Sequence, residues 1–374
     1  MKRIVSYLSI VLAISACRSG GQTISQLDPD NFITTVNGKE TGLYTLRNGS
    51  GMEVCITNFG GRIVSVMVPD KDGNMRDVVL GFDNIEDYLT IPSDFGATIG
   101  RYANRINQGR ITIDGITYQL PQNNFGHCLH GGEKGFQYRV FDISSVTDSS
   151  IVMHYTAADG EEGFPGKLDC TVAMTLTHDN SICIDYSAVT DRPTVVNMTN
   201  HSYFNLDGNP QHNNSDWLLT INADYFTPVD NTFMTSGELR RVDGTPMDFR
   251  SAASIGDRIC QNYEQLQNAN GIDHNWVLST KGDLSKIAAT IESPESGIRL
   301  DVYTTEPGIQ VYCGNFLDGS VSGKNGQPYH FRTAVCLETQ KYPDTPNKKD
   351  WPSAELRPGE VYRSTCIYKF STER

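Results

Sequence analysis

The segment CTVAMTLTHDNSICIDYSAVT, residues 170–190, decides the fold class of this chain. Apolar and polar residues alternate on both sides of Asp179-Asn180, the pattern of two half-buried strands joined by a tight turn. The segment RITIDGITYQL (110–120) repeats this pattern around Asp114-Gly115, a dipeptide that favours hairpin turns. Both segments predict antiparallel pairing between neighbouring strands.

The rest of the chain continues in the same way. Three more segments contain strand-like runs: 297–314, 330–342 and 361–370. Helical periodicity is faint, and only short helical turns are expected at 86–89 and 251–259. No long linker or internal repeat follows residue 30. The sequence therefore predicts an all-β protein with a single large antiparallel domain over 31–374.

The N-terminus has the features of an export signal. A basic start precedes the apolar run IVSYLSIVLAI (4–14), which is shorter than the roughly 20 residues of a spanning helix. Small residues then precede Cys17, as in bacterial lipoprotein signals. We therefore expect a signal peptide at 1–16, a lipidated Cys17, a flexible tether at 17–30, and a lipid-anchored protein of the cell envelope. The alternative is an ordinary secretory signal cleaved nearby.

The net charge of the chain limits the kinds of molecule that it is expected to bind. The formal net charge of −13 argues against nucleic acid and against anionic membrane surfaces, so membrane attachment is expected only through Cys17. A neutral small molecule is a better candidate for the binding partner. The nine cysteines are scattered without C-x-x-C pairs, and several lie in apolar runs, so mostly free thiols are expected. Oligomeric state is not visible in the sequence.

Five polar clusters interrupt the alternating background. They are GRYANRI (100–106), CLHGGEKGF (128–136), NMTNHSYFNL (197–206), NGIDHNW (270–276) and CLETQKYPD (336–344). Each cluster combines ionisable groups with amides, glycines or aromatic residues. A sugar-binding site needs this mixture, because sugar hydroxyls bind amides and carboxylates, and the apolar faces of sugar rings pack on aromatic groups.

Each cluster also has a structural interpretation. A lone histidine in a β-protein is more often structural than catalytic; His130 precedes a Gly-Gly turn, and Asp273 and His274 have the chemistry to brace a loop. Glu338 is different, because a carboxylate in an apolar strand must find donors or shift its pKa. The histidines lack the spacing of metal ligands, so no metal site is expected.

Taken together and in this order, the clusters resemble the aldose 1-epimerase (galactose mutarotase) family. The resemblance spans approximately residues 35–370 and includes NMTNHSYFNL, GRYANRI, LHGG, GIDHN, GNFLDG (314–319) and CLETQ. It implies a β-supersandwich that interconverts the α- and β-anomers of free aldoses such as glucose and galactose. It implies no metal and no cofactor.

The resemblance also implies roles for individual residues. Glu338 would be the base, His201 the acid, and His130 a second histidine near the ring oxygen. Four residues would hold sugar hydroxyls: Asn104, Arg105, Asp273 and Gln310.

The residues beside His201 suggest how the acid is held. We expect Asn197, Asn200 and Ser202 to help orient the imidazole, and a nearby carboxylate to favour its charged form. Two other functions remain open at this stage. One is a glycan-binding lipoprotein without catalysis, against which the intact His130, His201 and Glu338 argue. The other is a glycoside hydrolase, which would use two carboxylates.

Overall fold

The computed structural model describes residues 23–372. The hairpin expected at 170–190 is formed by β14 (Leu168–Leu176) and β15 (Ser181–Thr190), which pair antiparallel from Leu176↔Ile182 outward. Asn180 closes the turn with a φ of 62°, a conformation that asparagine tolerates better than most residues. Along β14 every second residue is buried, as the alternating sequence predicts.

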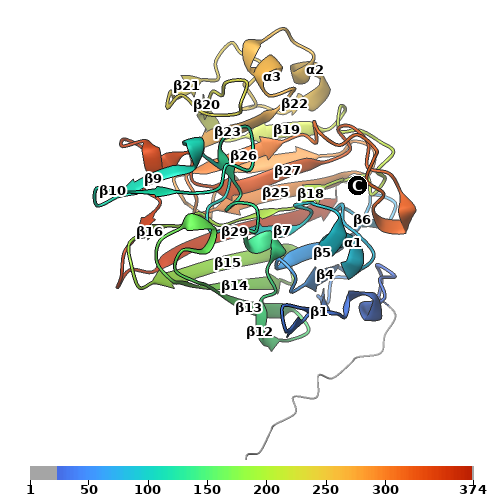
Figure 1. The fold of residues 1–374 in the computed structure, drawn as a ribbon. Helices are drawn as coiled ribbons and strands as arrows, with labels where there is room; N and C mark the ends of the chain where they lie inside the picture. The colour runs from blue at the N-terminus through green and yellow to red at the C-terminus, as the bar shows by residue number, and fades with distance from the viewer. Residues whose placement is uncertain (1–22, 373–374) are drawn as a thin grey trace, which may run out of the picture.

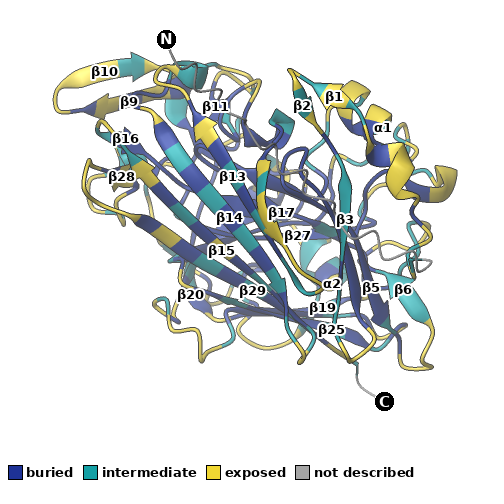
Figure 2. Ribbon diagram, turned by 90° about the horizontal axis from the view of Figure 1, so that it is seen from below, coloured by how far each residue is buried: buried dark blue, intermediate teal, exposed yellow. Residues whose placement is uncertain are grey.

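This hairpin lies in a nine-stranded sheet of order β12-β13-β14-β15-β29-β25-β24-β19-β22. Figure 2 shows bands of buried and more exposed residues alternating along β13, β14 and β15, so one face of the sheet is open to solvent. The other strands are β12 (Asp142–Val146), β13 (Ser150–Ala157), β19 (Leu218–Ile221), β22 (Ala253–Ser254), β24 (Ala289–Glu292), β25 (Ile298–Thr304) and β29 (Tyr362–Thr372).

A six-stranded sheet of order β18-β27-β26-β23-β20-β21 carries the site. Its strands β26 and β27 are buried at every position, in contrast to the half-open nine-stranded sheet. Val311 and Leu337 lie in the same apolar core as Leu300 and Tyr368 of the nine-stranded sheet. The strands are β18 (Tyr203–Phe204), β20 (Ala223–Thr227), β21 (Arg240–Arg241), β23 (Asp273–Leu278), β26 (Gly308–Tyr312) and β27 (Val335–Gln340).

A four-stranded sheet and five short strand pairs complete the β-structure, which fills most of the molecule in Figure 1. The four-stranded sheet is β3 (Leu43–Arg47), β4 (Glu53–Thr57), β5 (Arg62–Pro69) and β6 (Met75–Asp77). The pairs are β1 (Thr35–Val36) with β2 (Lys39–Glu40), β7 (Ala97–Ile99) with β17 (Thr199–His201), β8 (Arg105–Ile106) with β11 (Cys128–Leu129), β9 (Arg110–Ile113) with β10 (Ile116–Gln119), and β16 (Thr194–Val195) with β28 (Glu355–Leu356).

Helices are short, as the sequence predicts. α1 (Ile85–Thr90) covers the expected 86–89, and α2 (Ile255–Ile259) covers the second half of the expected 251–259, after the short strand β22. α3 (Glu264–Asn268) was not expected because its single turn leaves no periodic pattern. Within residues 23–372, no helix has the length and apolar character needed to cross a membrane. The 3₁₀ turns are Pro29–Phe32, Asn107–Gly109, Phe136–Tyr138, Glu161–Gly163, Lys324–Gly326 and Thr345–Asn347.

The N-terminal segment differs from its prediction. Residues 23–30, assigned above to a flexible tether, are held against the four-stranded sheet. The backbone N–H groups of Ile24 and Ser25 each donate to the buried carboxylate of Glu53 at 3.0 Å, and Leu27 is buried. A buried carboxylate needs donors, and this segment supplies two of them. The predicted signal peptide, Cys17 and residues 17–22 of the tether lie outside the described residues.

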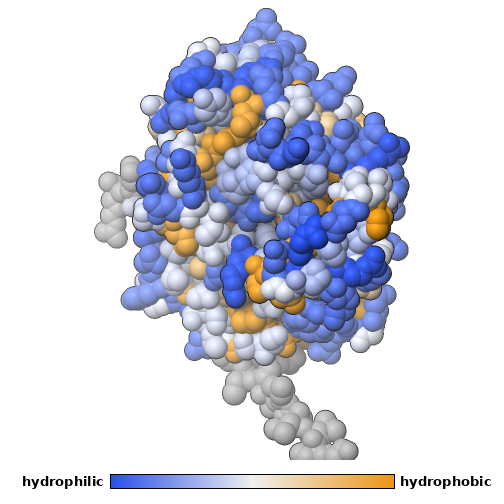
Figure 3. Space-filling model, turned by 90° about the vertical axis from the view of Figure 1, so that its left-hand side faces the viewer, coloured by the Kyte–Doolittle hydropathy of each residue, from blue (hydrophilic) through white to orange (hydrophobic). Residues whose placement is uncertain are grey.

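The cysteines and the surface agree with the sequence analysis. The eight cysteines within residues 23–372 are all free thiols. On the face shown in Figure 3 the surface is mostly hydrophilic, and apolar groups form small separate patches.

Candidate active site

Three neighbouring strands of the six-stranded sheet present a polar face. Antiparallel pairing sets Asn275 of β23 opposite Gln310 of β26, and Gln310 opposite Glu338 of β27. One step along, Asp273 lies opposite Tyr312. Alternate residues of a strand point to opposite faces, so these side chains share the face opposite to the apolar core. Strand register thus gathers the predicted residues Asp273, Gln310 and Glu338, which span 65 positions of the sequence.

His201 reaches this row from the neighbouring β17. Its Nε2 lies 3.5 Å from Oε1 of Glu338, and both side chains are almost completely buried. The imidazole also stacks on Tyr203, with 5.0 Å between ring centroids and 28° between ring planes. The pair has the composition that a proton exchange needs, because one member is basic as a carboxylate and the other is acidic as an imidazolium.

The amides of Asn197 and Asn200, near His201 in the sequence, bond to backbone groups and not to the imidazole. Asn200 donates to the carbonyl of Gly96 at 2.9 Å and accepts from the backbone N–H of Ser202 at 3.1 Å. Asn197 accepts from the backbone N–H of Lys341 at 2.9 Å. Asn197 and Asn200 therefore orient the imidazole indirectly, by holding the chain on either side of it.

His130 lies in a strained turn beside the pair. It has a φ of 52° and precedes two glycines that also have positive φ, so the turn expected from its sequence is present. Its ring is 5.1 Å from that of His201 between centroids. Its Nδ1 accepts a hydrogen bond from the backbone N–H of Asn104 at 3.2 Å. In neutral His130 the proton is therefore on Nε2, which is a donor.

The four residues expected to hold hydroxyls flank this centre. Gln310 donates to Oδ1 of Asp273 at 2.7 Å. Asn104 has a φ of 63° and accepts from the backbone N–H of Arg105 at 2.7 Å. Arg105 donates to Asn124 through Nε at 3.1 Å and through Nη2 at 3.0 Å. All seven residues proposed from the sequence thus lie around the polar face of one sheet.

Burial controls the ionisation of the site. It raises the pKa of Glu338 well above its usual value; the charges of Asp273 and Asp94 add to this, and Arg105 opposes it. Burial lowers the pKa of His201. Burial also holds the pKa of His130 well below its usual value, with the charges of His201 and Arg105 adding to the effect. A nearby carboxylate favours the charged imidazole as expected, because Asp94 raises the pKa of His201, but desolvation outweighs that attraction and the net shift is downward.

His274 of the GIDHN motif is structural. Its Nδ1 accepts from the backbone N–H of Asp273 at 3.2 Å, and its Nε2 lies 3.2 Å from Oε1 of Gln265. It packs in the core near Trp276, where burial lowers its pKa to about 3. The neighbouring Asp273 faces the opposite side of the strand, in the site.

An aromatic wall extends from the centre toward the surface. Tyr203 contacts Tyr312 edge-on, and Tyr312 stacks with Phe316. Phe316 in turn contacts Phe233, whose ring lies 4.7 Å from the Arg105 guanidinium carbon. Aromatic faces of this kind pack against the apolar faces of sugar rings. Phe233 has no signal in the sequence, because it lies in a loop without a recognised motif.

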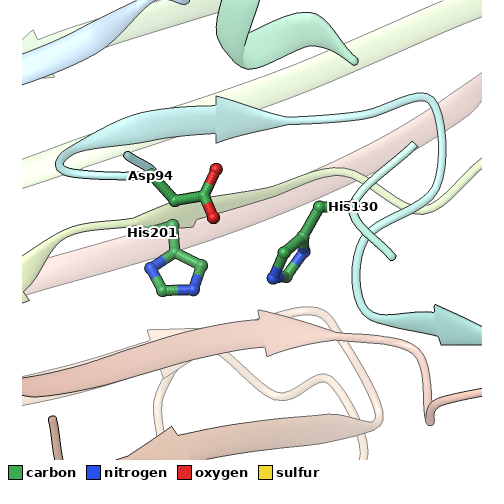
Figure 4. Close-up of side chains that lie close together, drawn as sticks. All are labelled: Asp94, His130 and His201. Atoms are coloured by element: carbon green, nitrogen blue, oxygen red, sulfur yellow. The ribbon is translucent and has the colours of Figure 1, made fainter. Parts of the chain in front are cut away.

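Asp94 is a further residue that the sequence did not indicate. It lies just before β7, and its carboxylate points into the space between the rings of His201 and His130 (Figure 4). One carboxylate oxygen and one nitrogen of each histidine lie within 4.8 Å of one another. Two histidines and a carboxylate can bind a transition metal. However, Nδ1 of His130 accepts from the backbone N–H of Asn104, which places the ring proton on Nε2, and a metal at Nε2 would have to displace that proton.

The comparisons with known proteins identify the family. The model of the aldose 1-epimerase family matches residues 42–369. The chain belongs to the aldose 1-epimerase family. It is 41% identical over 339 residues to aldose 1-epimerase from Escherichia coli, with 90% of this chain and 97% of that protein covered. It is 42% identical over 320 residues to mouse galactose mutarotase, with 86% and 91% covered.

A solved structure supports the same conclusion. An aldose epimerase homologue from C. elegans superimposes with a TM-score of 0.83 at 32% identity, and the match covers 89% of this chain and all of that one. The family, the isomerase class and the β-fold expected from the sequence are thereby confirmed.

Proposed function

We propose that this family member interconverts the α- and β-anomers of free aldoses such as glucose and galactose, with Glu338 and His201 as the proton-exchanging pair. The observation that carries the proposal is the 3.5 Å approach of His201 Nε2 to Glu338 Oε1 on a buried polar face. The site needs no electron transfer, because ring opening only moves protons and breaks one C–O bond.

The reaction begins with the ring form in the site. Glu338 takes the proton of the anomeric hydroxyl, the bond between C1 and the ring oxygen breaks, and His201 gives its proton to that oxygen. The open-chain aldehyde rotates about the bond between C1 and C2. Closure then runs the same steps backward on the other face of the carbonyl, which restores both groups.

One proton shared by the pair is sufficient for both directions. Burial raises the pKa of Glu338 and lowers that of His201, so the two groups compete for this proton in the free site. A sugar hydroxyl that donates to Glu338 stabilises its carboxylate and lowers its pKa, which shifts the proton toward His201. The pair therefore titrates as a unit.

The remaining residues position the sugar. His130 presents its Nε2 proton to the ring-oxygen side, where charge develops during opening. Asp273 is held by Gln310, and together they offer an acceptor and a carbonyl to hydroxyls. Asn104 and Arg105, next to His130, bind further hydroxyls. The aromatic wall contacts the apolar ring face.

Polarimetry on freshly dissolved α-glucose and α-galactose tests the function. We expect the protein to accelerate the change in optical rotation of both sugars toward its equilibrium value, and to leave the identity of each sugar unchanged. Two other outcomes would overturn it. Sugar binding without acceleration would indicate a binding protein, and release of nitrophenol from nitrophenyl glycosides would indicate a hydrolase.

For location, we propose that the protein is a lipoprotein of the cell envelope, anchored only through Cys17. The basic start, the short apolar run and the small residues before Cys17 support this. Cells grown with an alkyne fatty acid should give labelled wild-type protein and unlabelled Cys17→Ser. Equal labelling of the two proteins would refute the lipid anchor, and secretion of both in soluble form would favour an ordinary signal peptide.

A further inference from the structure

Asp94 is the least expected charged group near the catalytic pair. The residue is half-buried, and its carboxylate faces the two histidine rings (Figure 4). Among residues 23–372, no side chain donates a hydrogen bond to this carboxylate, and the one bond that Asp94 accepts, from the backbone N–H of Ala97, ends on its main-chain carbonyl. An acidic group in such a place, without a donor from the protein, is available to interact with a charged imidazole or with bound substrate.

The segment that carries Asp94 is rigidly held from behind. Arg62 is completely buried, and its guanidinium donates to the carbonyl of Phe95 at 3.0 Å and to that of Ser93 at 3.1 Å. These carbonyls belong to the two residues that flank Asp94. The Phe95 ring also packs edge-on against Tyr203 at 4.8 Å. The backbone of Asp94 is therefore fixed by a buried cation and by the aromatic wall.

The same segment is tied directly to the strand of His201. The backbone N–H of Gly96 donates to the carbonyl of His201 at 3.0 Å, and the Asn200 amide donates to the carbonyl of Gly96. Asp94 and His201 are thus placed relative to each other by short backbone connections. The position of the Asp94 backbone relative to His201 is therefore a property of the fold.

We propose that Asp94 is a positioning residue whose negative charge holds the catalytic proton on His201 until the ring oxygen accepts it. The inference rests on the proposed function, because it assigns Asp94 to the step in which His201 is the donor. A fixed carboxylate at this range stabilises an imidazolium in a low-dielectric site without covalent change.

The charges around His201 support this assignment. Glu338 on β27 and Asp94 before β7 are its acidic neighbours, while Arg62 on β5 and His130 after β11 are basic. Burial lowers the pKa of His201, Asp94 raises it, and Arg62 lowers it further. Asp94 is therefore the charge that opposes desolvation at this imidazole.

Asp94→Asn tests the proposal because it removes the charge and keeps the shape. Asp94→Glu is the charge-conserving variant, and Asp72→Asn, at an exposed loop position, controls for net charge. The first readout is the NMR titration of the His201 ring, assigned with His201→Asn. We expect its apparent pKa to fall by about one unit in Asp94→Asn. It should stay near wild type in the other two variants.

The second readout is the pH profile of mutarotation. Loss of a negative charge makes protonation of the pair harder, so both limbs of the kcat profile should move to lower pH in Asp94→Asn. A raised KM with unmoved limbs would overturn the proposal and make Asp94 a hydroxyl ligand. A lower melting temperature with an unchanged His201 titration would overturn it in favour of a structural role.

The two readouts separate this inference from the proposed function. The NMR titration needs no turnover, so it reports on Asp94 even in a protein without mutarotase activity. Wild-type protein that does not accelerate mutarotation refutes the function. An active wild type whose His201 titration is the same in Asp94→Asn refutes only the role of Asp94.

Discussion

Glu338→Gln removes the proposed base and keeps the size and shape of the side chain. Glu338 is 2% exposed and lies 3.5 Å from His201, so water has little access to replace the carboxylate. The loss of one general acid–base group costs about 10²–10⁴-fold in rate, which corresponds to about 3–5 kcal/mol in the barrier. We expect a fall of this size in kcat for both glucose and galactose.

The same variant should keep its stability at neutral pH. Burial raises the pKa of Glu338, so the folded protein binds this proton more tightly than the unfolded chain does. Wild-type stability therefore falls as the pH rises from the unfolded value of about 4.3 through the folded pKa. Glutamine does not ionise, so Glu338→Gln should be at least as stable as wild type at pH 7. The stability advantage of Glu338→Gln over wild type should shrink toward pH 4.

Glu53→Gln is the matched control. Glu53 is also a buried carboxylate, but it pairs with Arg47 at 2.8 Å and accepts from the N-terminal segment at Ile24 and Ser25. Glu53→Gln should lower the melting temperature and leave kcat unchanged, the reverse of Glu338→Gln. Polarimetry and thermal unfolding measure both. A folded Glu338→Gln protein with a wild-type rate would show that another group is the base.

Three further predictions concern the two histidines, Asp273 and the exposed Cys260. His201→Asn should lower kcat sharply and remove the alkaline limb of the pH profile. His130→Asn should lower kcat and keep that limb, because burial already holds His130 neutral. The opposite pattern would show that the roles of the two histidines are exchanged. Asp273→Asn should raise KM more than it lowers kcat, because Asp273 is held by Gln310 as an acceptor for hydroxyls; an unchanged KM would exclude that contact. Iodoacetamide should label native protein first at Cys260, which is exposed, as peptide mass mapping would show.

Local pattern determined the fold class and the main hairpins. The alternation at 170–190 and the Asp114-Gly115 turn describe interactions between residues close in sequence, and strand period and turn chemistry are recorded there directly. The motifs around His130, His201 and Glu338 were visible because polar groups interrupt that alternation. Their meaning came from resemblance to a family.

Tertiary structure alone decided how these groups act on one another. The register that sets Gln310 beside Glu338, the position of Asp94 between two histidines and the packing of residues 23–30 all depend on segments far apart in the chain. The net direction of the pKa shift at His201 was also hidden, because desolvation depends on everything that packs around a group. A sequence records the chemistry of each side chain, but burial and distance exist only once the sheets have packed.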